Sequence, residues 1–409
     1  MSDFQPEDGR SVGERVRAIR ARRGISQQVL ADRVGVSRGA VAKWENGERP
    51  VDSRRTLLAL AEALRVTVGD LTGHESDRLD PATAGFHAAV PEIEIALWTA
   101  GNTTDTAPPR PLGELATTAQ RAAELRIACD YAALGPMLAP LLTDCYRHIR
   151  DTTGADRDRA WDVLSMVAHT TAAALKARGY GALSWTAAQE AENAARNIGG
   201  TAALAAVAFA RSQVLLSRPG SLPAALTHAE GTAETIAADV RTLGEVESFG
   251  MLHLQASLVV AALGGDPEPH LAEAAEQAAR LPEAPAGTSI LRNPTFGPAN
   301  VRLWRMSAAM ERREPGAVLA LAPTLSPADL PAEGRRAQYF VEIGRAQAMR
   351  KNYPAALHAL LRAEHTAPQH VRSMTPVREL VGYMMRTARR ELTTGDLGRL
   401  AQRIGVVPA

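Results

Sequence analysis

The sequence predicts an all-α protein in two parts, a small N-terminal helical domain followed by a long series of antiparallel helix pairs. Aromatic residues make up 4 % of the 409 residues and alanine is abundant, which favours closely packed helices over sheets. Apolar residues recur at helical spacing from Val12 onwards. Short stretches containing Gly or Pro separate the longer periodic segments, as expected for turns between paired helices.

The charge balance excludes a general polycation but points to a basic N-terminal region. The formal net charge is +1 at pH 7, so the chain as a whole has no strong attraction for nucleic acid. Between residues 10 and 55, however, basic residues outnumber acidic ones by more than two to one. Arginine greatly outnumbers lysine, which is the usual consequence of a GC-rich genome.

Cysteine usage and the N-terminus indicate a cytoplasmic protein. The two cysteines, Cys129 and Cys145, suggest neither a disulfide framework nor a metal site and are expected to be small apolar residues on helices. Residues 1–10 are polar and acidic without the apolar core of a signal peptide, and we expect them to be frayed. No uninterrupted apolar run approaches the roughly 18 residues of a membrane span, so no membrane partner is expected.

Three short helices can be placed near the N-terminus. Apolar residues line one face of a helix that begins at Val12 and stops before Gly24. Ser26 and Ser37 are suited to cap the two helices that follow, because a serine oxygen accepts an otherwise unpaired backbone N–H. Gly35 lies at the turn between them, where a positive φ favours glycine. The residues that together form the helix-turn-helix pattern are Leu30, Ala31, Gly35, Val36, Val41 and Trp44.

On these residues the segment from Gly24 to Gly47 resembles the Cro/C1-type helix-turn-helix family, also called the XRE family. Members have a five-helix module, and the resemblance extends over residues 12–72 because a fourth helix over Val51–Leu64 and a closing segment after Leu64 also fit. The resemblance implies that the third helix, residues 37–46, enters the major groove of double-stranded DNA. It therefore predicts a DNA-binding domain over residues 11–72.

The same resemblance suggests which side chains meet the bases. The exposed positions near the start of the third helix are Arg38, Gly39, Ala42 and Lys43. Arg38 can offer a bidentate fork to guanine, and Lys43 a single donor one turn further on. Gly39 departs from the family pattern, in which a polar side chain often reads a base. It either lets the backbone approach the DNA closely or leaves that base step unread.

A second group of residues is expected to contact phosphates. The family resemblance assigns this role to Gln27 and Asn46. Charge alone suggests it for four arginines, each of which is as easily explained as a solvated surface charge. These are Arg23, Arg49, Arg54 and Arg55.

The remaining chain divides into a linker and a long helical region. Residues 73–111 are expected to be a linker that contains a short connecting helix, because polar stretches with turn residues flank the apolar segment 88–98. After Leu112 the sequence predicts antiparallel helix pairs. The clearest helices are Ala160–Lys176, Trp185–Ala195, Ala202–Leu216, Leu222–Ala238 and Gly244–Leu263.

Residues 340–368 contain an internal-repeat pattern. Gly344, Ala356, Leu360, Ala363 and Pro368 follow one another at the spacing of a tetratricopeptide (TPR) repeat, and residues 203–233 show a weaker version. Residues 112–409 are therefore expected to form a TPR-like superhelix, with a generic helical bundle as the alternative. A superhelix of this kind presents a concave face suited to peptides or protein segments.

The architecture resembles actinobacterial XRE regulators that carry degenerate TPR tails. Peptide-sensing regulators of Gram-positive bacteria share the architecture, but that likeness does not by itself imply a peptide ligand. A polar and aromatic group at one helix start is a candidate ligand face, although packing between repeats is the favoured role. Its members are Arg292, Asn293, Phe296, Asn300 and Trp304.

The predicted function is sequence-specific transcriptional regulation. The chain has no Walker loop, no nucleophile elbow and no zinc-protease motif, so we expect neither an enzyme nor a cofactor or metal. One module reads few bases, so a homodimer is expected, with dimerisation and sensing of a peptide, small molecule or protein assigned to the helical region. The alternatives are a TPR-type interaction scaffold with accessory DNA binding and an enzyme that carries a DNA-binding domain.

Overall fold

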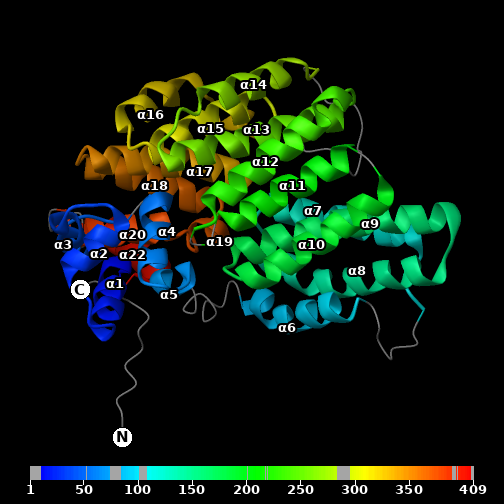
Figure 1. Cartoon of the computed structure of the whole chain (residues 1–409), viewed down its shortest axis with the longest axis horizontal. Coiled ribbons are helices and arrows are strands. Elements are labelled where there is room, and N and C mark those ends of the chain that lie inside the picture. Colours follow the sequence, from blue (N-terminus) through cyan, green and yellow to red (C-terminus); the bar gives the residue numbers. More distant parts are fainter. Residues whose placement is uncertain are drawn as a thin grey trace, which may run out of the picture.

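The computed structural model describes residues 11–51, 53–73, 84–100, 108–199, 201–216, 218, 220–282, 295–388, 393 and 395–406. Within these ranges the chain consists of α-helices and short 3₁₀ helices and contains no strand, which confirms the all-α prediction (Figure 1). A small N-terminal group of helices lies against one side of a larger array of paired helices.

The N-terminal domain has the five predicted helices. Each begins at a serine or threonine whose side-chain oxygen accepts a backbone N–H three residues on, which supplies a partner to one unpaired donor of the first turn. The fourth helix begins at Arg54, three residues later than the sequence suggested, because Ser53 is its cap. The helices are α1 (Val12–Arg22), α2 (Gln27–Val34), α3 (Arg38–Glu45), α4 (Arg54–Ala63) and α5 (Val68–Thr72).

The larger part is a succession of antiparallel helix pairs, which we call the helical domain. Most of its longer helices pack on their neighbours in sequence, and α8 and α13 are buried along most of their length. Its helices are α6 (Ala84–Thr99), α7 (Leu112–Ile127), α8 (Tyr131–Asp151), α9 (Gly154–Ala177), α10 (Gly181–Ile198), α11 (Thr201–Leu215), α12 (Leu222–Ile236), α13 (Leu243–Leu263), α14 (Glu268–Ala279), α15 (Pro298–Glu311), α16 (Pro315–Leu321), α17 (Glu333–Met349), α18 (Tyr353–Thr366), α19 (Pro368–Val371), α20 (Thr375–Thr387) and α22 (Asp396–Arg403).

The repeat pattern corresponds to the pair α17 and α18. A Cβ on Gly344 would lie 3.1 Å from Leu360 Cδ2, so glycine lets the two helices approach closely. Ala356, Leu360 and Ala363 are all fully buried on α18. Pro368 begins α19, where a missing N–H costs no helical hydrogen bond. Small residues at these positions therefore set the spacing between the two helices.

Helix α6, the expected short connecting helix, is longer than the sequence suggested and belongs to the main core. Phe86 and Ile93 on α6 are fully buried, and α6 packs on α8 and α10. A Cβ on Gly135 of α8 would lie 2.7 Å from the Phe86 backbone, so the two helices approach closely there. The polar segments that flank α6 in the sequence lie largely outside the described residues.

The N-terminal domain is fixed to the helical domain by two carboxylates. Glu379 Oε1 of α20 accepts the Val12 N–H at 2.8 Å, and Glu311 Oε2 of α15 accepts the Arg54 N–H at 3.2 Å. Val12 and Arg54 are the first residues of α1 and α4, whose N–H groups have no partner within their own helices. Glu311 also pairs with the Arg54 guanidinium at 3.5 Å. We call Glu311 and Glu379 the amide clamps.

An apolar contact accompanies the amide clamps. Leu58 of α4 is buried in a cluster of the helical domain that includes Met251 and Trp304, whereas Leu60 on the same helix belongs to the N-terminal domain's own core. Helix α4 therefore has two apolar faces, one for each part of the molecule. Arg386 of α20 adds a long hydrogen bond to the Gly47 carbonyl, at 3.5 Å.

By length and composition alone, helix α13 could cross a membrane. The sequence criterion of an uninterrupted apolar run did not identify it, because polar residues occur within the helix. Within the fold, 83 % of its most apolar window is buried. This burial is typical of the central helix of a folded domain, and α13 packs on α11, α12, α14 and α15.

The two cysteines are buried and unpaired with each other. Cys145 lies on α8 as expected, but Cys129 follows α7 with a φ of 56° and is not on a helix. Burial raises the pKa of the Cys129 thiol, so neither position favours a reactive thiolate.

Candidate DNA-binding surface

Helices α2 and α3 are joined by the tight turn that the sequence predicts. Gly35 ends α2 in the left-handed conformation, with φ of 75°, and its N–H donates to the Ala31 carbonyl. Ser37 then caps α3 by accepting the Ala40 N–H at 3.2 Å. A residue with a Cβ would be strained at Gly35, so the glycine fixes where α3 begins.

The underside of this unit is a small apolar core. Leu30, Ala31 and Val41 are fully buried and Trp44 is 4 % exposed, while Val36 is partly buried beside them. These residues hold α3 by its inner face, so its outer face is left to solvent.

Gly13 of α1 is a structural determinant that sequence analysis missed. A Cβ at this position would lie 1.8 Å from the Trp44 carbonyl oxygen, so the backbone of α1 touches the C-terminal end of α3 directly. The one available signal was a glycine inside an otherwise helical segment, which costs helix stability without an obvious local reason.

Glu45 is the second determinant that the sequence did not reveal. This carboxylate is 2 % exposed and forms two hydrogen bonds with Arg20 of α1, at 2.6 and 2.9 Å, and one with Gln27 of α2, at 2.8 Å. Burial alone would raise the pKa of Glu45, but the bonds from Arg20 and Gln27 hold it below its ordinary value. The network joins α1, α2 and α3 through one buried ion pair.

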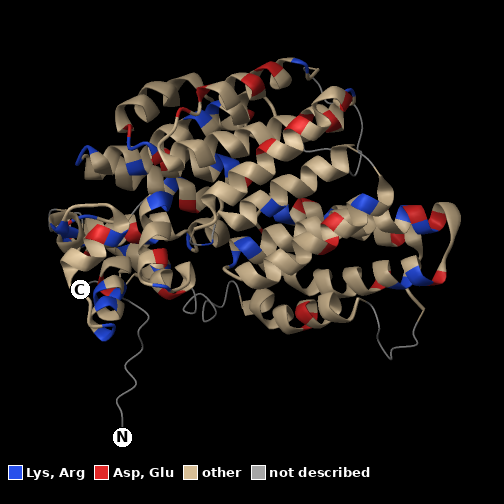
Figure 2. Cartoon of the chain, viewed as in Figure 1, with Lys and Arg blue, Asp and Glu red and all other residues tan. Residues whose placement is uncertain are grey.

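The outer face of α3 carries the side chains that the sequence assigned to base contact. Arg38 and Lys43 are exposed, Gly39 is exposed between them, and Ala42 is partly buried. These four positions lie on one helix face that is free of the rest of the described chain. In Figure 2 the ribbon is blue, for Lys and Arg, at several positions of α1 and around α3, whereas blue and red positions are interspersed over the helical domain.

Gly39 has open space around it. The nearest atom to an added Cβ would be Ser37 Oγ, at 3.9 Å, which is an ordinary contact. Its backbone is helical, so an L-residue would not be strained there. Nothing in the protein itself requires glycine at this position.

The six expected phosphate contacts fall into two groups. Asn46 is exposed at the C-terminal end of α3, and Arg23 is exposed at the end of α1, where it donates to the Arg65 carbonyl at 3.2 Å. The Gln27 amide is held by Glu45, while its backbone N–H lies at the start of α2, a position that favours anions. Arg49 is partly buried beyond α3.

Arg54 and Arg55 form the second group and face the helical domain. Arg54 is paired with Glu311, and the Arg55 guanidinium lies against the turn at Gly264 after α13. In this arrangement neither is presented beside Arg38 and Lys43. The sequence showed two charges at a helix start but not that this helix end packs against another part of the chain.

The expected ligand face is partly internal. Phe296 is buried with its ring where a Cβ of Gly250 would lie, and Trp304 is 3 % exposed. Asn300 donates to Met251 Sδ at 3.5 Å. Phe296 and Asn300 therefore act as packing residues here. Arg292 and Asn293 lie outside the described residues.

No grouping of three or more His, Cys, Asp or Glu side chains that could hold a metal ion occurs in the part of the chain that the structure describes.

Comparison with known proteins supports the interpretation of the N-terminal domain. A family model described as a helix-turn-helix domain matches residues 11–74. A propionyl-CoA carboxylase regulator from Cereibacter sphaeroides is 39 % identical over 67 residues, which cover 16 % of this chain and 14 % of that protein. The HTH-type transcriptional repressor RghR from Bacillus subtilis is 41 % identical over 56 residues, 14 % of this chain and 42 % of the relative. The matched segment thus spans less than half of either relative.

Among solved structures, the crystal structure of Bacillus thuringiensis PlcR in complex with the peptide PapR7 and DNA is similar over 66 % of this chain and 94 % of that chain. The identity is 15 % and the TM-score 0.32, which is too low to transfer any feature. The assignment therefore stands on the family match and on the geometry of α1–α5. Residues 11–74 of this chain are a helix-turn-helix domain.

Proposed function

We propose that the protein is a sequence-specific, DNA-binding transcriptional regulator of the cytoplasm. In this proposal α3 enters the major groove, Arg38 and Lys43 contact base edges, and Gln27, Asn46, Arg23 and Arg49 contact phosphates. The helical domain provides dimerisation and effector sensing.

The observation that carries the proposal is the exposure of one face of α3. Arg38 and Lys43 lie on the exposed face of α3. The opposite side of this helix is held by the buried core of the domain, by the contact of Gly13 with the Trp44 carbonyl and by the Arg20–Glu45 ion pair. A rigid helix with a free cationic face can present a guanidinium at fixed geometry to the groove. The two similar regulators support regulation of transcription as the outcome of DNA binding.

The test is selection of bound sequences from a random double-stranded DNA library, followed by mobility shifts with the recovered site. Full-length protein is expected to enrich one motif, and Arg38→Ala is expected to lose roughly 1–3 kcal/mol at a single base position while retaining affinity for the rest of the site.

Arg33→Ala is the matched control. Arg33 is an exposed arginine on α2 that donates to the Ala63 carbonyl, away from the face of α3. It should leave the enriched motif unchanged. Recovery of no motif, or an Arg38→Ala motif identical to that of the parent protein, would contradict the proposal.

A further inference from the structure

Three partly buried cations of the helical domain have no acidic partner among the described residues. Arg126 of α7, Lys176 of α9 and Arg335 of α17 have no ion pair with any carboxylate among the described residues. We call these three residues the interior cations. Each retains partly accessible surface, although each is deep enough for burial to lower its pKa.

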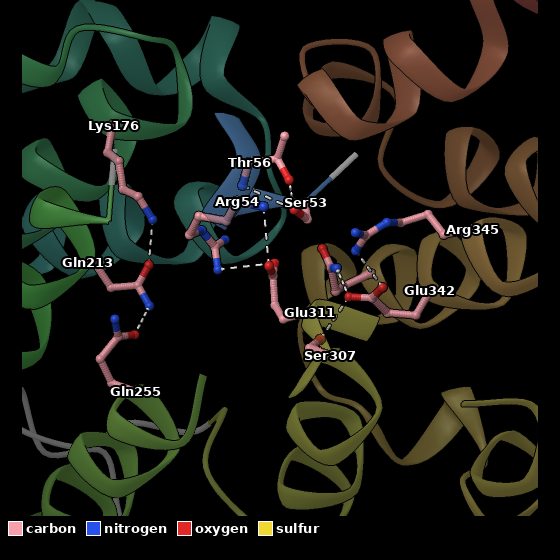
Figure 3. A network of polar contacts seen from close by, with 11 residues as sticks. Ser53, Arg54, Thr56, Lys176, Gln213, Gln255, Ser307, Glu311, Glu342 and Arg345 are labelled. Atoms are coloured by element: carbon pink, nitrogen blue, oxygen red, sulfur yellow. Dashed lines mark hydrogen bonds and ion pairs between the residues drawn. The ribbon is translucent and has the colours of Figure 1, made fainter. Parts of the chain in front are cut away.

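Two carboxylates near this region already have their own partners. Glu311 is paired with Arg54, and Glu342 accepts from Arg345 at 2.9 Å, from Ser307 at 2.8 Å and from Gln338 at 2.6 Å (Figure 3). Glu333 affects the Cys129 thiol but pairs with none of the interior cations. Within the described part of the chain, no carboxylate forms an ion pair that would neutralise an interior cation.

The interior cations are close enough to repel one another. Burial, together with the charges of Arg54 and Arg335, lowers the pKa of Lys176 to about 7. Burial also lowers the pKa of Arg335 to about 10, with Arg126 as the next cause. His370 is kept neutral by burial and by Arg335, Arg178 and Lys176, with a pKa of about 4. Such mutual repulsion would be relieved by an anion placed among these groups.

Three donors near the interior cations have no hydrogen-bond partner among the residues that the structure describes. Gln255 is fully buried and its Nε2 has no hydrogen-bond partner, while its Oε1 accepts from Gln213, whose own oxygen accepts from Lys176. Trp304 is 3 % exposed, its Nε1 has no partner, and Arg335 lies over its ring at 5.2 Å. Arg126 Nε is a third such donor. Buried donors are normally paired with protein or water, so these three donors are available to an oxyanion bound beside the cations.

We propose that the interior cations form an oxyanion-binding site, which receives a phosphate or carboxylate group of an effector with Trp304 and Gln255 as additional donors. The proposal deepens the sensing role given above by naming the chemistry of the effector. Guanidinium and ammonium groups supply charge-assisted hydrogen bonds to either oxyanion.

The site also touches the DNA-binding domain. Arg54 at the start of α4 is near enough to Lys176 to lower its pKa, and it is held there by Glu311 (Figure 3). An anion bound between Lys176 and Arg54 attracts both, so it strengthens the attachment of the helix-turn-helix domain to the helical domain. Effector binding and the position of α3 are therefore linked.

The experiment is titration of the full-length protein with inorganic phosphate, and in parallel with citrate, at constant ionic strength maintained with sodium chloride, followed by thermal unfolding and calorimetry. Saturable stabilisation is expected with at least one anion, and the one that binds more tightly distinguishes a phosphate from a carboxylate effector. Arg126→Gln and Lys176→Gln should each weaken this binding about tenfold, the loss of one charge-assisted hydrogen bond.

Arg121→Gln is the control, since Arg121 lies on the same helix as Arg126, is exposed and pairs with Glu124. It should bind anion as the parent does.

In chloride alone, Arg126→Gln should unfold at the same or a higher temperature than the parent, because the substitution removes repulsion between cations rather than a stabilising contact. Absence of saturable binding by both anions, or binding unchanged in both Gln variants, would overturn the site. DNA binding measured in chloride tests the proposed function separately and does not depend on this outcome.

Discussion

Gly39 occupies the middle of the exposed face of α3, at a position where the protein would accept a larger residue. Glycine in a helix costs about 1 kcal/mol relative to alanine, and the surroundings offer no compensation, since an added Cβ would meet only Ser37 Oγ at 3.9 Å. The compensation is therefore expected in the complex with DNA, where a bare backbone can approach a base or phosphate closely.

Gly39→Ala is accordingly expected to stabilise the protein by up to about 1 kcal/mol and to weaken DNA binding. Thermal unfolding and mobility shifts on the selected site measure the two effects. Gly231→Ala, in a helix with no atom within 4 Å of the added Cβ, should stabilise similarly and leave DNA binding intact. An unchanged affinity in Gly39→Ala would show that the glycine leaves a base step unread rather than allowing close approach.

Glu379 makes the attachment of α1 dependent on pH. Burial raises its pKa from 4.5 to about 7, although the Val12 N–H, Arg386 and Arg378 oppose the shift and Glu14 adds to it. The folded protein therefore holds this proton more tightly than the unfolded chain does. The resulting stabilisation is complete below pH 4.5 and is lost as the pH rises through 7.

Glu379→Gln keeps an oxygen for the Val12 N–H and removes the titration. The stability of the variant relative to the parent should thus increase between pH 5 and pH 8 by about 3 kcal/mol at most. Thermal unfolding at several pH values measures the difference. A parent and variant that respond identically to pH would show that Glu379 ionises normally.

At the scale of elements, the close approach of α1 to α3 depends on a glycine. A Cβ on Gly13 would overlap the Trp44 carbonyl oxygen, which belongs to the backbone and cannot rotate away. Gly13→Ala should therefore separate α1 from α3 and destabilise the helix-turn-helix domain by about 1–3 kcal/mol or more.

Hydrogen exchange of the α3 amides and DNA affinity should both report the loss. Gly113→Ala, in the first turn of α7 with nothing within 4 Å of the added Cβ, serves as the control and should be neutral or slightly stabilising. If Gly13→Ala binds DNA as the parent does, the contact has no role in orienting α3.

Local sequence signals predicted the elements well. Serine caps and glycine turns marked α1–α3 to within a residue, and the five clearest helices of the helical domain were found with errors of a few residues at some ends. What could not be predicted is partnership between distant segments. Leu58 and Leu60 lie two residues apart on α4 and enter different cores, and Arg20 of α1 pairs with the buried Glu45 at the end of α3. Hydrophobic periodicity gives the buried face of a helix but not the surface that covers it.

At the scale of the whole molecule, the proposed dimer needs a surface on the helical domain. The most exposed large apolar side chains among the described residues are Ile95 and Trp98, one turn apart on α6, with 56 % and 69 % of their surface accessible. Aromatic residues are enriched at protein interfaces, because burying a large apolar ring in an interface is more favourable than leaving it exposed to water. We therefore expect α6 to contribute to the contact between two copies.

Trp98→Arg should shift the protein from dimer to monomer and reduce affinity for a two-fold symmetric DNA site more than for a half-site. Sedimentation and mobility shifts measure the two effects. Leu204→Arg, at a less exposed apolar residue on α11, is the control. A Trp98→Arg protein that remains dimeric would exclude this face of α6.

The amide clamps have a consequence for how such a protein can acquire new targets. The hydrogen bonds that Glu311 and Glu379 accept come from main-chain N–H groups, which every residue except proline possesses. These two attachments are thus indifferent to most side-chain changes in the reading domain. A domain with the same backbone but a different base preference keeps them, provided that Arg54 and Leu58 retain their side-chain contacts with the helical domain. The residues of α3 that face the DNA can therefore diverge faster than the residues of α4 that face the helical domain.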